Sequence, residues 1–268
     1  MEKTPAKTGA GEPDVWELLK NEASEVSKRE PEMAGYLENT VLRHGNLGEA
    51  MAHFLGQKLG TANGDAAMIR GACLKAFAAD PSILESAVMD MKASTERDPA
   101  FRTWLQPFLF FKGPAALHVY RVAHWLWNNG RPALAYHLQS LCSQVFQVDI
   151  HPAARLGSGI FVDHATGLVI GETSVVGDDV SILHGVTLGG SGKDKGDRHP
   201  KIGRGVLLAA GATVLGNIKV GDHARVAACS VVLEDVPPHT TVAGIPAKPV
   251  RVPTPENPAE VMEHRLKK

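Results

Sequence analysis

The sequence has 268 residues and a mass of 28.6 kDa, enough chain for one large domain or two ordinary ones. Hydrophobic residues make up 44% and charged residues 21%, the composition of a globular protein rather than a disordered or fibrous one. Lys and Arg number 28 against 29 Asp and Glu, so the net charge of -1 argues against nucleic acid or an anionic membrane as a partner.

Three cysteines are spread along the chain, at Cys73, Cys142 and Cys229. Their odd number and wide spacing fit neither a disulfide framework nor a CxxC motif, which favours a reducing compartment. The first residues are polar and lack the apolar stretch of a signal peptide, and the sequence has no run of 18 apolar residues. We therefore expect a cytoplasmic protein without a membrane segment.

The first half of the chain follows a helical pattern. Residues 1–13 carry Pro, Gly and charge without periodicity, so we expect them to be disordered. Over residues 14–147, apolar residues recur at intervals of three and four, interrupted by Pro and Gly. This pattern predicts an N-terminal domain of seven or eight short helices.

Residues 148–252 follow a different pattern, with 16 of the 27 glycines lying between residues 150 and 250. Aliphatic residues recur at every sixth position, first in one phase and then, after a polar interruption, in a shifted one. The expected interior positions are Ile150, Leu156, Val162, Leu168, Ser174 (the exception), Val180, Val186, Ile202, Leu208, Val214, Val220, Val226 and Val232. A period of six suits short strands joined by tight corners, so the segment predicts a parallel β-helix rather than a β-sandwich.

The polar interruption spans residues 189–201 and is rich in Gly and charge. Long loops on rigid scaffolds often carry function, so we expect this loop to protrude from the β-helix and contribute to a site. Residues 253–268 are expected to form a C-terminal tail.

Two clusters in this half pair an imidazole with a carboxylate. Asp149 and His164 lie 15 residues apart, close to one 18-residue coil, so the carboxylate could orient the ring as a general base requires. The second cluster is Asp197, Arg198 and His199, in the loop.

A metal site is the alternative use of these histidines, because some trimeric β-helices hold zinc between coils and subunits. The candidate ligands are His151, His164, His184 and His199. Arg204 stands where a second imidazole would be needed, and Arg198 would repel a cation. We therefore expect no metal.

With these motifs, the sequence resembles the serine O-acetyltransferases, members of the left-handed hexapeptide-repeat acyltransferases. The resemblance covers about residues 95–250 and rests on DPAFR, VDIHPAA, DHATG and GDRHPKI, joined to an N-terminal helical domain. It implies an α+β fold in which an all-helical domain precedes a left-handed parallel β-helix with one protruding loop. It also implies acetyl transfer from acetyl-CoA to the hydroxyl of L-serine, which begins cysteine biosynthesis.

The resemblance assigns roles to individual residues. His164 corresponds to the general base and Asp149 to its orienting carboxylate, while His199 is expected to assist from a neighbouring subunit. For the substrate, Arg198 and His199 correspond to contacts with the serine carboxylate. Asp98 and Asp163 correspond to contacts with the ammonium group, so negative side chains face the positive group of serine.

Coenzyme and partners also follow from the resemblance. In the family, CoA lies in the groove between neighbouring β-helices, and the matching positions here are Gly190, Ala210 and Ala228, with Lys248 near the phosphates. The family forms trimers that commonly pair into hexamers, and L-cysteine inhibits many members. Members commonly end in an isoleucine that enters O-acetylserine sulfhydrylase; this sequence ends in Lys268, which argues against that partnership.

Other functions fit the same fold. The acceptor could be homoserine, a sugar or an amine, because one methylene changes binding by only about 1–3 kcal/mol. A γ-carbonic-anhydrase-like metalloenzyme and a catalytically silent assembly scaffold are the alternatives from other classes. The intact Asp149, His164 and His199 argue against a silent scaffold.

Overall fold

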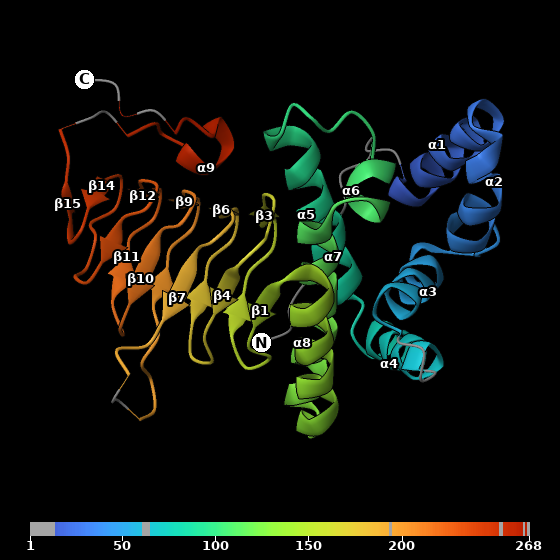
Figure 1. Cartoon of the computed structure of the whole chain (residues 1–268), viewed down its shortest axis with the longest axis horizontal. Coiled ribbons are helices and arrows are strands. Elements are labelled where there is room, and N and C mark those ends of the chain that lie inside the picture. The colour runs from blue at the N-terminus through green and yellow to red at the C-terminus, as the bar shows by residue number, and fades with distance from the viewer. Residues whose placement is uncertain (1–13, 61–64, 193–194, 252–253, 265, 267–268) are drawn as a thin grey trace, which may run out of the picture.

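The computed structural model describes residues 14–60, 65–192, 195–251, 254–264 and residue 266. The expected disorder of residues 1–13 and the terminal Lys268 lie outside these residues. A helical region is followed by a β-helix, with the two stacked end to end (Figure 1). The helices are α1 (Val15–Arg29), α2 (Pro31–Leu37), the π-helix η1 (Glu38–Leu42), α3 (Leu47–Leu59), α4 (Asp65–Ala79), α5 (Ser82–Arg97), α6 (Leu105–Leu109), α7 (Lys112–Asn128), α8 (Pro132–Phe146) and, near the C-terminus, α9 (Pro258–Val261). None of the helices in the described part of the chain is long and apolar enough to cross a membrane.

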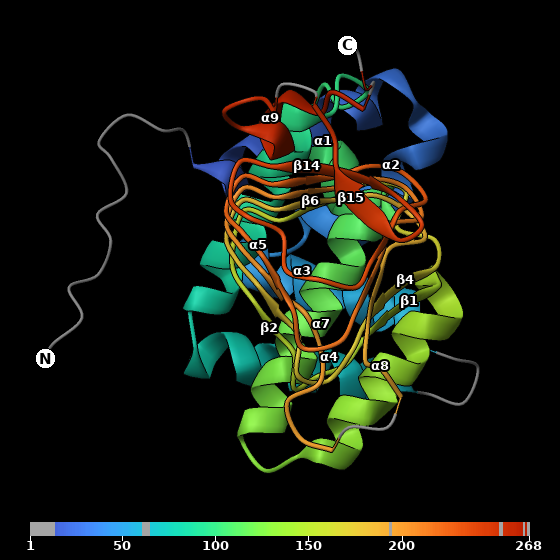
Figure 2. The same ribbon diagram turned by 90° about the vertical axis from the view of Figure 1, so that its left-hand side faces the viewer.

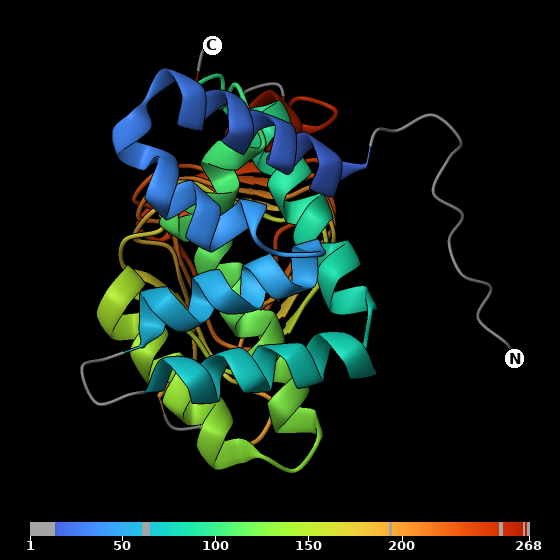
Figure 3. The same cartoon turned by 90° about the vertical axis from the view of Figure 1, so that its right-hand side faces the viewer.

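Helices α1 and α3 begin at residues whose side chains cap them. Asp14 accepts a hydrogen bond from the Trp16 amide at the start of α1. Before α3, Asn46 accepts from the Glu49 amide while Glu49 accepts from the Gly45 amide, so two free amides are satisfied together. The helices α1–α4 lie on the side of the molecule away from the β-helix (Figure 3).

Three parallel sheets form the faces of a triangular prism (Figure 2). We call them the first, second and third sheets. The first contains β1 (Val148–Ile150), β4 (Leu168–Ile170), β7 (Thr187–Gly189), β10 (Thr213–Leu215) and β13 (Val231–Val232). The second contains β2 (Arg155–Leu156), β5 (Val175–Val176), β8 (Lys201–Ile202) and β11 (Lys219–Val220). The third contains β3 (Phe161–Val162), β6 (Ser181–Ile182), β9 (Leu207–Leu208), β12 (Arg225–Val226), β14 (Thr241–Gly244) and β15 (Ala247–Pro249), of which β15 alone is antiparallel to its neighbour. The expected helical domain and parallel β-helix are confirmed.

The expected phase of the repeat is wrong from Leu168 to Val186 and correct again from Ile202. Ile150 pairs with Ile170, so the first coil takes 20 residues rather than 18. The extra two residues lie in the turn between β3 and β4, where His164 and Ala165 both have positive φ. Ile170, not Leu168, therefore continues the row that begins at Ile150.

This shift explains the exceptional serine. Leu168 continues a second interior row that starts at Val148, and Ser174 holds the equivalent interior place one corner later, above the small Ala154. The next coil is longer still, because Ile182 pairs with Leu208, 26 positions on. Its additional residues form the protruding loop between β7 and β8. Both departures from the 18-residue coil carry candidate site residues.

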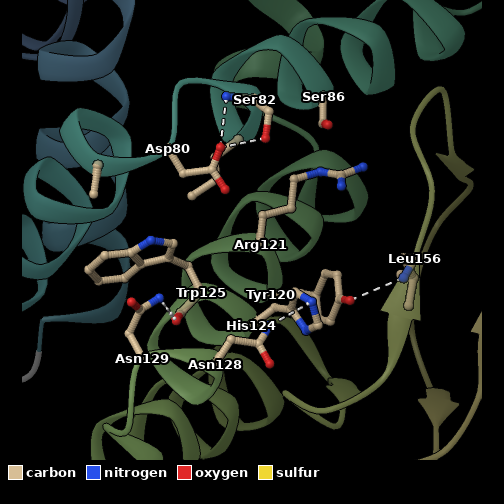
Figure 4. A pocket seen from close by; sticks show the side chains of 12 residues that line it. Asp80, Ser82, Ser86, Tyr120, Arg121, His124, Trp125, Asn128, Asn129 and Leu156 are labelled. Carbon is tan, nitrogen blue, oxygen red and sulfur yellow. Dashed lines mark hydrogen bonds between the residues drawn. The ribbon is translucent and has the colours of Figure 1, made fainter. Parts of the chain in front are cut away.

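Helices α5, α7 and α8 cover the open end of the first coil (Figure 1). The carboxylate of Asp90 is fully buried, pairs with Arg121 at 2.6 Å and accepts from the Ile160 amide. The Tyr120 hydroxyl donates to the Ala154 carbonyl and accepts from the Leu156 amide; Figure 4 shows the second of these hydrogen bonds. These buried polar contacts fix the helices on the β-helix, because breaking one would leave a buried polar or charged group without a hydrogen-bond partner.

Candidate active site

The candidate residues gather along the two long edges of the first sheet. The entry edge consists of the turns that lead into it, residues 163–167, 183–186, 209–212 and 227–230. The exit edge consists of the described segments that leave it, residues 171–174, 190–192, 195–200 and 216–218. A sheet of short strands therefore separates two groups of side chains within one chain.

His164 lies on the entry edge, in the enlarged turn of the first coil. Its side chain is 74% exposed, and its Nε2 atom lies 3.7 Å from Oδ1 of Asp163. The ring of His184, one coil on, meets it edge to face at 5.8 Å. Lys112, at the start of α7, donates to the Thr166 hydroxyl and so holds the same turn from the helical side. The turn thus presents an exposed imidazole to solvent, and Lys112 holds the turn from the helical side.

Two carboxylates lie close enough beside this imidazole for their charges to interact. Asp98 follows the last residue of α5, and Asp163 follows β3. Burial raises the pKa of Asp163, and the negative charge of Asp98 raises it further while His164 opposes the shift. Two like charges held together attract a cationic group that neutralises both.

Asp149 occupies the middle of β1, directly beside the enlarged turn. The Gly167 amide donates to the carbonyl of Gln147, so the two coils are in contact here. The Asp149 carboxylate accepts from Gln139 of α8 at 2.6 Å. Within the described residues, Asp163 is the carboxylate paired with His164, and no contact of Asp149 with that ring is found.

His199 lies on the exit edge and, unlike His164, is buried. Its Nδ1 accepts from the Thr173 amide at 3.2 Å, which leaves the proton of the neutral ring on Nε2. The Thr173 hydroxyl lies 2.9 Å from Nδ1 and accepts from the amides of Arg198 and His199. Burial lowers the pKa of His199, and the nearby Arg198 lowers it further. A side chain at Gly171 would overlap the ring, so that glycine makes room for it.

Arg198 lies beside His199 and is held by a carboxylate. Its Nη2 atom donates to Glu172 at 2.6 Å, and this hydrogen bond lowers the pKa of Glu172. Asp197 points away, to Lys201 at 2.5 Å. The exit edge therefore presents a fixed guanidinium and a neutral imidazole, a suitable pair for a carboxylate.

The predicted coenzyme residues fall in three places. Ala210 and Ala228 lie on the entry edge, in successive coils above His184, and Ala228 is exposed. Gly190 lies on the exit edge, where a Cβ would come within 3.4 Å of Arg198. Lys248 lies in β15 and pairs with Glu234 at 2.9 Å. Only the two alanines share an edge with His164.

Several neighbours were missing from the sequence-based prediction. Glu172 and Thr173 fix Arg198 and His199 from the preceding coil, 26 positions back, and the enlarged loop hides that spacing in the sequence. His151, considered as a metal ligand, packs edge to face against Trp127 and Tyr136. Within the described part of the chain, no group of three or more His, Cys, Asp or Glu is placed to hold a metal ion.

Comparisons with known families agree with this architecture. A family model described as serine acetyltransferase, N-terminal, matches residues 15–119, and one described as bacterial transferase hexapeptide (six repeats) matches residues 199–234. The serine acetyltransferase of Salmonella typhimurium is 51% identical over 94% of this chain and 92% of its own length. That of Haemophilus influenzae is 49% identical over 88% of each.

Solved structures share the whole fold. A serine acetyltransferase from Vibrio cholerae superposes with a TM-score of 0.91 at 51% identity, covering 94% of this chain and 97% of the other. One from Neisseria gonorrhoeae in complex with serine gives 0.87 at 48% identity, covering 91% and 100%. One from Brucella abortus in complex with coenzyme A gives 0.86 at 49%, covering 88% and 94%. A further serine acetyltransferase, in complex with cysteine, gives 0.91 at 47%, covering 94% and 98%.

Proposed function

Because this chain belongs to the serine acetyltransferase family, we propose that it transfers the acetyl group of acetyl-CoA to the hydroxyl of L-serine, giving O-acetyl-L-serine and CoA. The observation that carries the proposal is the 51% identity over nearly the whole chain, together with a relative that binds serine and another that binds coenzyme A. The carboxylates on the entry side suit the ammonium group of an amino acid, and the guanidinium on the exit edge suits its carboxylate.

In the proposed mechanism, His164 acts as general base. Its exposed imidazole takes the proton of the serine hydroxyl as the oxygen attacks the thioester carbon; the carbon–sulfur bond then breaks and the proton passes to the departing CoA thiolate. No covalent acyl-enzyme is required. Asp149 orients the imidazole, a role supported by its place in the neighbouring coil, and reaching the ring would require its carboxylate to turn from Gln139.

The two charged groups of serine bind at different edges of the first sheet. Asp98 and Asp163, on the entry side, bind the ammonium group, while Arg198 and His199, on the exit edge, bind the carboxylate. One sheet separates these groups in a single chain, so we place the complete site where the entry edge of one subunit meets the exit edge of the next. A closed trimer of this kind repeats the site three times, and His199 then assists from the neighbouring subunit.

The coenzyme is placed in the groove between the same two subunits. The exposed Ala228 and the half-buried Ala210 leave room for the pantetheine arm along the entry edge, and Gly190 does so on the exit edge. Lys248 contributes charge near the phosphates. Pairing of trimers through the helical region would give a hexamer, and L-cysteine, which a relative binds, would compete with serine as a feedback inhibitor.

The direct test is thiol release. Purified protein is mixed with acetyl-CoA and a chromogenic thiol reagent, with L-serine, D-serine, homoserine, a galactoside or no acceptor. We expect release with L-serine. Release with another acceptor alone would overturn the serine assignment, and stoichiometric zinc with loss of activity on chelation would favour the metalloenzyme alternative.

A further inference from the structure

Arg97, the last residue of α5, makes more contacts with the β-helix than its place on a helix end requires. It is 9% exposed. Its Nη1 atom donates to the carbonyl of Asp179 at 3.3 Å, to that of Val180 at 3.5 Å and to the hydroxyl of Ser181 at 3.2 Å. Its Nη2 atom lies 3.6 Å from the Asp179 carboxylate. A buried guanidinium with this many partners fixes the end of α5 on the β-helix.

These partners lead directly to the entry edge. Ser181 begins β6, which pairs with β3 through Phe161. Two residues after Phe161 comes Asp163, whose amide donates to the Ile182 carbonyl at 2.9 Å. The contacts of Arg97 therefore join the end of α5 to the strand pair that places Asp163.

The C-terminal segment encloses the same contacts. The Ser181 hydroxyl donates to the Ala259 carbonyl of α9 at 2.7 Å. Beside it, Phe101 and Phe161 form a small buried cluster against which Met262 packs. With water largely excluded, the hydrogen bonds of Arg97 have little competition from solvent.

Asp98 depends on this anchor because it ends the helix that Arg97 fixes. Its amide donates to the Ser94 carbonyl, and its carboxylate accepts from the Ala100 amide at 2.8 Å, so it is fixed relative to α5. Repulsion between Asp98 and Asp163 works to separate α5 from the entry edge. Something must hold the two carboxylates together when no ammonium group lies between them.

We propose that Arg97 is a positioning residue for serine binding: it fixes the end of α5 on β6 so that Asp98 faces Asp163 before substrate arrives. Arg97 itself does not touch the substrate. The proposal rests on the proposed function, since it explains how one half of the serine site is assembled. It predicts that loss of Arg97 weakens serine binding without weakening acetyl-CoA binding.

Arg97→Gln is the main test, and Arg204→Gln is its matched control. Arg204 pairs with the same Asp179 carboxylate at 3.1 Å, but its side chain is 66% exposed. We expect Arg97→Gln to raise the KM for serine about tenfold and leave the KM for acetyl-CoA within about twofold, because one charge-assisted anchor is lost from one half-site. Arg204→Gln should leave both KM values within about twofold. Arg97→Lys, which keeps one cationic donor, should restore part of the serine affinity.

A double-mutant cycle separates positioning from general stability. In an Asp98→Asn background, adding Arg97→Gln should raise the serine KM by less than about twofold further, because the group it positions has already lost its charge. An unchanged serine KM in folded Arg97→Gln, equal rises for both substrates, or full additivity with Asp98→Asn would each overturn the proposal. Wild-type protein that does not acetylate serine would instead overturn the proposed function.

Discussion

The two edges of the first sheet carry histidines in opposite states. On the entry edge, His164 is exposed, stands on a turn with positive φ and has a carboxylate 3.7 Å away. On the exit edge, His199 is buried, accepts from the Thr173 amide and has a lowered pKa. The difference suggests a division of labour, in which an accessible imidazole moves a proton and a fixed neutral one binds substrate.

Removing the entry-edge imidazole should give the largest effect. We expect His164→Ala to lower kcat by about 10²–10⁴, the usual contribution of a general base, while the protein keeps its fold and binds CoA. Thiol release measures kcat, and calorimetry measures CoA binding. His239→Asn is a suitable control, since His239 is exposed and its positive φ suits asparagine. Near-normal turnover in His164→Ala would show that His164 is not the general base.

Removing the exit-edge guanidinium should act on binding instead. Arg198→Ala should raise the KM for serine about 10–100-fold with a smaller change in kcat, because a charge-assisted contact to the carboxylate is lost. The comparison is with His164→Ala under the same assay. A fall in kcat as large as that of His164→Ala, with an unchanged KM, would contradict the division of labour.

The buried state of His199 also predicts a pH dependence of stability. Its folded pKa lies below the 6.5 of the unfolded chain, so the unfolded state takes up a proton first as pH falls. Its contribution to stability is complete above about pH 6.5 and decreases as the pH falls toward the folded pKa. Thermal unfolding at pH 7.5, 6.5 and 5.5 should show a smaller loss for His199→Gln than for wild type. The same pH dependence of stability in both proteins would show that folding does not lower the pKa of His199.

The smallest effect is expected beyond both edges, at Lys248. Its side chain is 60% exposed and already pairs with Glu234. Lys248→Ala should raise the KM for acetyl-CoA by about twofold, an effect that should fade in high salt, as screened surface charges do. The serine KM should not change. A salt-independent rise well above that would indicate a direct contact with the coenzyme.

The repeat could be predicted from the sequence because an aliphatic residue at every sixth position matches neither the period of an α-helix nor the alternation of a long strand. The phase error after Val162 arose because the two extra residues in the His164 turn leave Leu168 buried in the neighbouring row. Arg198 and His199 were identified from their motif, but Thr173 and Glu172 were not, since they lie in another coil. Arg97 shows the same limit, because its partners are more than 80 residues away in sequence.

In the proposed assembly, the entry edge of one subunit and the exit edge of another form one site. Co-expression of differently tagged His164→Ala and Arg198→Ala subunits, selected for both tags and assayed at low serine, tests it directly. Each variant alone should be nearly inactive, whereas mixed trimers pair an intact entry edge with an intact exit edge at one interface in three and should recover about a third of the wild-type kcat/KM. Mixed trimers no more active than the separate variants would contradict a site shared between subunits, because both edges would then have to act within one chain.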